Sequence, residues 1–151
     1  MNVILGRLWL ETGLAFTEVP DSSSSYGQLR FGANQQTTTK GYSFIPGKTP
    51  DARAGDVWLD VETLQLMGQG QEGWEVLLHE IGHALGLSHP LDGGSATHAT
   101  LPANVDNIRN TLMSYTNTDR NLVLTVVSNG QGGWSANFST GVYASTPMLY
   151  D

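Results

Sequence analysis

Three histidines and a glutamate lie within one short stretch of this 151-residue chain, HEIGHALGLSH, which begins at His79. On a helix, residues four apart face the same side, so His79 and His83 can direct ring nitrogens at one metal ion. Glu80 would then lie beside a metal-bound water, as a base and not as a ligand. The spacing predicts a catalytic zinc site.

A glycine in the same stretch indicates how a third ligand reaches the metal. Gly86 can take the left-handed conformation that ends a helix, and the reversal that follows would bring His89 back to the same ion. The fourth histidine of the chain, His98, lies in a polar stretch, where we expect a solvated role. The predicted metal ligands are therefore His79, His83 and His89.

The helix that must carry these ligands is the strongest element of the sequence. From Trp74 to Leu85, apolar residues recur at helical spacing and form a stripe beside the ligands, which predicts core packing. An earlier helix is predicted over residues 2–12, with Gly13 as its stop. Residues 92–110, after the last ligand, are polar and predict a loop.

Short strands are predicted on both sides of the ligand helix. Those before it cover residues 15–19, 28–32, 41–45 and 56–61. The segment 56–61 alternates polar and apolar residues, which is typical of a strand with one buried face, and we expect an edge strand. After the helix, residues 122–127 and 134–143 flank an Asn129-Gly130 turn signal and predict a β-hairpin.

Composition limits the class of protein and of site. A content of 39% hydrophobic and 14% charged residues is ordinary for one soluble globular domain. The net charge of −7 argues against nucleic acid or an anionic membrane as the main partner. The chain has no cysteine, which excludes disulfides and thiolate ligands and leaves coordination to histidine. No bilayer-spanning run and no secretory signal are visible.

The histidine motif, continued by Pro90 and followed by Thr111-Leu112-Met113-Ser114-Tyr115, resembles the metzincin metallopeptidases, and among them the serralysin-type enzymes most closely. Further segments resemble family segments in the family's order: AFTEV at 15–19, LRFG at 29–32, GDVWL at 55–59 and TPMLYD at 146–151. The resemblance covers most of the chain. It implies an α+β zincin catalytic domain with one catalytic zinc ion.

The same resemblance implies the organisation of the domain. A twisted mixed sheet and the active-site helix would form an upper subdomain of about residues 1–86, above a small irregular lower subdomain of about residues 87–151. Family members continue into a long helix and calcium-binding repeats, which this sequence lacks, so calcium is not predicted. An extracellular monomer that acts on protein or peptide substrates in extended conformation is expected.

Roles for further residues follow from the family. Met113 would be the methionine of the Met-turn, packed beneath the histidines, although an ordinary core methionine would look similar. Tyr115 would approach the zinc and later hydrogen-bond the tetrahedral intermediate, with simple packing as the alternative. The strand through Val57, Trp58 and Leu59 would border the cleft and bind substrate by strand addition.

The expected reaction is hydrolysis of peptide bonds. Three neutral imidazoles leave zinc its full charge and one open position, which lowers the pKa of a bound water toward about 7. Glu80 would take the proton of that water as the general base and pass it to the departing amine. A catalytically silent zinc-binding or peptide-binding module is the alternative. A structural site usually has a fourth protein ligand, which this motif does not supply.

Overall fold

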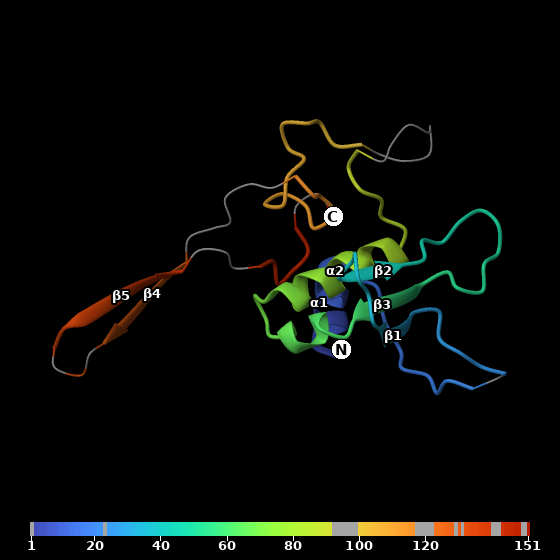
Figure 1. Ribbon diagram of the computed structural model, residues 1–151, viewed down its shortest axis with the longest axis horizontal. Coiled ribbons are helices and arrows are strands. Elements are labelled where there is room, and N and C mark those ends of the chain that lie inside the picture. The colour runs from blue at the N-terminus through green and yellow to red at the C-terminus, as the bar shows by residue number, and fades with distance from the viewer. Residues whose placement is uncertain are drawn as a thin grey trace.

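Helices and two small sheets make up the computed structural model, which describes residues 2–22, 24–91, 100–116, 123–128, 130, 132–139, 143–148 and 151 (Figure 1). Its elements, in chain order, are α1 (Asn2–Thr12), β1 (Arg30–Asn34), β2 (Gly41–Ser43), β3 (Asp56–Asp60), the 3₁₀ helix η1 (Thr63–Leu66), α2 (Glu72–Ala84), β4 (Val123–Ser128) and β5 (Trp134–Ser139). The mixture of helix and sheet confirms the predicted α+β class.

The first sheet has the strand order β1-β3-β2. β3 pairs in parallel with β1, where Phe31 lies opposite Val57, and antiparallel with β2, where Tyr42 lies opposite Trp58. The expectation of an edge strand at residues 56–61 is therefore wrong, because β3 is central. Alternation of polar and apolar residues reports which face of a strand is buried, and it carries no information about lateral neighbours.

The core forms where α2 packs against β2 and β3. Leu77 and Ile81 of α2 are fully buried and belong to one core cluster with Val57 of β3. α1 closes the same core with Ile4 and lies behind α2 in Figure 1. The prediction of core packing for the apolar stripe holds at Leu77 and Ile81, as expected from a 3.6-residue period. It is wrong at Leu85, which is 37% exposed because α2 ends there.

Most predicted elements are present with small shifts in their bounds, and one is not. Residues 15–19, all of them described, form no strand, and only Phe16 among them is half-buried. Strand-like composition does not suffice for a strand, because the backbone groups need a partner strand.

The predicted hairpin is confirmed as β4 and β5, which project away from the helices in Figure 1. Of the predicted loop at 92–110, residues 100–110 contain no helix or strand, whereas residues 92–99, including His98, lie outside the described residues. Among the described residues, no helix combines the length and the apolar character needed to cross a bilayer.

Candidate metal centre

The end of α2 turns the chain back toward its own last turn. Gly86 has φ of +103°, and its N–H donates to the carbonyl of His83 over 2.9 Å. The N–H of Leu87 donates to the carbonyl of Gly82, also over 2.9 Å. This pair of bonds is the Schellman motif, which needs a left-handed residue at the position of Gly86. The reversal predicted from the sequence is confirmed, and it carries the chain to His89.

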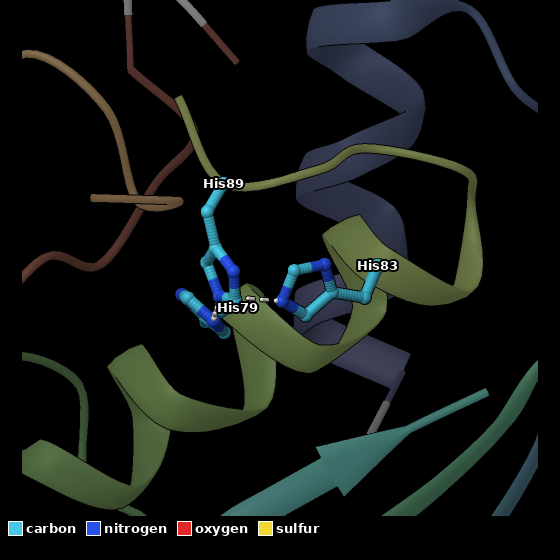
Figure 2. Close-up of side chains that lie close together, drawn as sticks. All are labelled: His79, His83 and His89. Carbon is cyan, nitrogen blue, oxygen red and sulfur yellow. Dashed lines mark hydrogen bonds between the residues drawn. The ribbon is translucent and has the colours of Figure 1, made fainter. Parts of the chain in front are cut away.

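The three predicted ligands converge. His79 and His83 come from one face of α2, and His89 reaches them from the segment after the turn (Figure 2). The Nε2 atom of His89 lies 3.0 Å from Nε2 of His83 and 3.3 Å from Nε2 of His79. Within the described part of the chain, these three histidines are the group that could hold a metal ion, and the ligand atoms that they offer lie within 4.8 Å of one another.

Backbone carbonyls orient two of the rings. His79 Nδ1 lies 2.6 Å from the carbonyl oxygen of Leu112, and His83 Nδ1 lies 2.8 Å from that of Leu87. Because a carbonyl oxygen can only accept, each Nδ1 must carry a proton and donate it, and in the neutral ring this leaves the lone pair on Nε2. Such bonds to the second ring nitrogen are typical of histidines that bind a metal.

These distances suit a zinc ion. Tetrahedral zinc with Zn–N bonds of about 2.0–2.1 Å separates its nitrogen ligands by about 3.3 Å. The two Nε2 separations of 3.0 and 3.3 Å are close to that value. Burial lowers the pKa of His79 from 6.5 to about 4, which keeps the ring neutral and its lone pair available at neutral pH. The donor set therefore fits the implied metal.

Glu80 is buried next to His79 on α2, and its hydrogen-bond partner is Ser43 on β2. Burial raises the pKa of Glu80, whereas a hydrogen bond from Ser43 acts in the opposite direction. The Ser43 hydroxyl donates to Glu80 Oε2 over 2.7 Å. Sequence reasoning missed this residue, because the contact joins residues 37 positions apart and no local pattern signals it.

Met113 lies directly against the ligand helix. Its side chain is 3% exposed, and a Cβ atom placed on Gly82 would come within 2.7 Å of its sulfur. Leu112, the preceding residue of the same tight turn, supplies the carbonyl that accepts from His79. We call residues 111–113 the Met-turn.

Tyr115 lies over the histidine cluster. Its hydroxyl oxygen is 3.4 Å from His79 Nε2, and its ring centroid is 4.5 Å from that of His89. The side chain is 74% exposed, so it is not a packed core tyrosine. The position leaves the phenol accessible to a molecule bound at the cluster.

The strand through Val57, Trp58 and Leu59 has no free edge for the strand addition expected of it. Val57 and Leu59 are buried in the core, and the backbone of β3 is paired on both sides. Strand addition requires a free edge. Within the described residues, the strand with a partner on one side only and a side chain at the site is β2, whose Ser43 contacts Glu80.

Comparison with known proteins identifies a relationship over most of the chain. Residues 17–125 match the family Reprolysin_5, described as metallo-peptidase family M12. The chain is similar to metalloprotease AprA of Pseudomonas entomophila, with 30% identity over 91% of this chain and 28% of that protein. It is also similar to a serralysin of a Photorhabdus species, with 30% identity over 90% of this chain and 27% of that protein. The chain thus spans just over a quarter of the length of each of these two relatives.

Proposed function

Since the chain belongs to metallo-peptidase family M12 and is serralysin-like, we propose that it is a zinc-dependent endopeptidase with Glu80 as its general base. The observation that carries the proposal is the convergence of three ring nitrogens beside a buried carboxylate. His79 and His83 supply two of them from the helix that also carries Glu80, and His89 supplies the third.

Glu80 would move the proton between water and the leaving amine. When bound, zinc supplies a Lewis acid that lowers the pKa of a water molecule and polarises the substrate carbonyl. Glu80 accepts a proton from the attacking water and then donates it to the departing nitrogen. Its raised pKa, caused mainly by burial, brings the group nearer to neutral operating pH, where a single carboxyl can work in both directions.

Ser43 would hold the carboxylate of Glu80 during this transfer. Its bond to Oε2 orients the group, so we assign the proton transfer to Oε1.

Tyr115 would donate its phenol hydrogen to the oxyanion that develops on the substrate. Removal of a single oxyanion donor elsewhere costs about 100- to 1000-fold in kcat, and we expect Tyr115→Phe to show a loss of that order with unchanged zinc affinity.

We assign substrate binding to the open edge of β2, in place of the strand through Val57 and Leu59. The residues that flank β2 are bonded to β3, through the carbonyl of Lys40 and the N–H of Phe44. Because antiparallel pairs alternate the direction of their backbone groups, Gly41 and Ser43 then point theirs toward the free edge. An extended peptide could pair there, next to Glu80.

The remaining expectations are kept as proposals from the resemblance to serralysins. We propose an extracellular monomer that acts on protein or peptide substrates. We also propose the division of the domain near Gly86 into an upper and a lower subdomain.

Zinc content and casein digestion, measured on the parent protein and on Glu80→Ala, test the proposed function. The parent should bind one zinc ion and digest casein, and a chelator should stop digestion. Glu80→Ala should retain zinc and lose nearly all turnover, because the ligands remain and the base does not. Zinc binding without digestion by the parent would favour the silent binding module, and digestion by Glu80→Ala at the parent rate would refute the assignment of the base.

A further inference from the structure

We propose that Asp151 is a positioning residue for the metal centre: its carboxylate holds the Met-turn, and the Met-turn backbone orients His79. The proposal rests on the proposed zinc site, because the ring that it orients is one of the three ligands. It concerns a carboxylate that lies 72 positions from His79 in the sequence.

The carboxylate of Asp151 binds the Met-turn at two points. Its Oδ1 atom accepts from the Thr111 hydroxyl over 2.5 Å and from the N–H of Leu112 over 2.8 Å. The Thr111 hydroxyl in turn accepts from the N–H of Met113 over 3.0 Å. One carboxylate oxygen thereby organises three consecutive residues, and Thr111 is only 1% exposed. Hydrogen bonds to a charged acceptor in such a buried place are stronger than neutral ones.

Leu112 connects this arrangement to the metal centre. Its N–H is bonded to Asp151, and its carbonyl oxygen accepts from His79 Nδ1 over 2.6 Å. The carbonyl of Leu112 shares a rigid peptide plane with the N–H of Met113, and that N–H donates to the Thr111 hydroxyl that Asp151 holds. The direction of the acceptor therefore depends on Asp151. The acceptor in turn determines the tautomer and the orientation of the His79 ring, which is how partners behind a ligand adjust metal sites in general.

The other oxygen of Asp151 ties the Met-turn to the helix that carries His79. Oδ2 accepts from the N–H of Met148 over 2.7 Å. Earlier in this terminal segment, the N–H of Ala144 donates to Glu75 on α2 over 2.6 Å. The indole of Trp74, also on α2, donates to the segment's backbone. Figure 1 shows the C-terminus close to the orange segment that leads into the Met-turn. The described residues of the terminal segment thus bind both α2 and the turn that orients its first ligand.

Two measurements on Asp151→Ala test the proposal. The first is the affinity for zinc alone, from competition with a chromogenic chelator, and the second is amide hydrogen exchange of Leu112 in the metal-free protein. We expect zinc affinity to fall about 10- to 100-fold, the range found when such supporting partners are removed, and Leu112 exchange to accelerate. Asp151→Asn keeps an acceptor oxygen for the Met-turn and should lose less. Asp21→Ala removes the same charge from an exposed loop and should change neither quantity.

Parent-like zinc affinity in folded Asp151→Ala would overturn the proposal, even if Leu112 exchange accelerates. If Asp151→Ala does not fold, the pair Thr111→Val and Thr111→Ser decides. Loss of affinity in the valine variant alone supports the proposal, because only serine keeps the hydroxyl that Asp151 binds, and equal affinities overturn it. The parent's casein digestion is scored separately. A parent that binds zinc but does not digest casein would refute the proposed function and leave the role of Asp151 standing.

Discussion

Ser43 and Glu80 form the pair of side chains at which the proposed proton transfer can be tested most directly. The hydroxyl of Ser43 stabilises the charged form of Glu80 and partly offsets the rise in pKa that burial causes. Ser43→Ala removes a hydrogen bond to a charged group, worth about 1.5–3 kcal/mol, so we expect kcat/KM to fall at least about tenfold. The pKa of Glu80 should rise further, which moves the acid limb of the kcat/KM profile to higher pH.

The matched control for this prediction is Ser43→Thr, which keeps the hydroxyl and suits a strand. Its pH profile should follow that of the parent, and zinc affinity should be the same in all three proteins. A pH profile of Ser43→Ala that superimposes on the parent profile would show that the hydrogen bond does not act on the base.

His79 makes the stability of the metal-free protein depend on pH. Its pKa is lowered by burial from 6.5 to about 4, so between these values the unfolded chain binds a proton that the folded ring does not. The stability associated with the neutral ring is complete above about pH 6.5 and is lost as the pH falls toward 4. At 1.36 kcal/mol per unit, the free energy of unfolding should drop by about 2–3 kcal/mol between pH 7 and 4.5.

Urea unfolding of the metal-free parent and of His79→Gln at both pH values measures this contribution. The raised pKa of Glu80 acts with the opposite sign, since its stability is lost as the pH rises, but it is present in both proteins and cancels in the comparison. Equal pH dependence in the two proteins would contradict the prediction.

At the residue scale, the sequence was enough to predict the candidate ligands but not the residues that support them. His79, Glu80, His83 and His89 could be predicted because helical spacing and a glycine reversal determine their geometry locally. Ser43 and Asp151 could not, since their contacts depend on tertiary packing between distant segments. The same limit applies to Trp58. The sequence was enough to recognise its strand, but not the pairing with β1 and β2 that leaves this strand without a free edge.

At the scale of elements, the packing of α2 on the Met-turn depends on the absence of a side chain at Gly82. A Cβ atom there would lie 2.7 Å from the sulfur of buried Met113. In a helix, alanine is more favourable than glycine by about 1 kcal/mol, but forced overpacking of a buried side chain costs about 1–3 kcal/mol. We therefore expect Gly82→Ala to lower the free energy of unfolding by about 1 kcal/mol, measured by urea denaturation.

Gly6 provides a control with the opposite expected sign. It is exposed on α1, and a Cβ atom there would meet nothing within 4 Å. Gly6→Ala should therefore stabilise the protein by about 1 kcal/mol through helix propensity alone. If Gly82→Ala stabilises the protein, Met113 can move away from the added methyl group at little cost, and its packing against α2 is not tight.

Elements with a strong local signal were predicted well, whereas their arrangement in the sheet was not. The bounds of α1 agree with the predicted 2–12, and α2 begins two residues before the predicted Trp74. β3 was recognised by its alternation, but its central place depends on β1 and β2, which come from other parts of the chain. Residues 15–19 show the same limit, because strand-like composition cannot reveal that no partner strand is available.

For the whole molecule, the core and the metal centre share α2. Leu77 and Ile81 pack with Ile4 and Val57 in an apolar cluster that extends to Met113, and the contacts between these apolar side chains do not need a bound ion. Removal of zinc should therefore stop catalysis without unfolding the domain. This separation distinguishes a catalytic site from a structural one, where the metal supplies much of the folding free energy.

Treatment with a chelator, followed by casein digestion, far-ultraviolet circular dichroism and thermal unfolding of the same sample, tests this expectation. Digestion should cease while the helical signal persists, and the midpoint of thermal unfolding should fall because a ligand of the native state has been removed. Added zinc should restore digestion and the midpoint together. A helical signal that disappears on chelation at room temperature would place the metal among the structural supports of the fold, because the apolar cluster around Ile81 would then be unable to hold α2 against the sheet on its own.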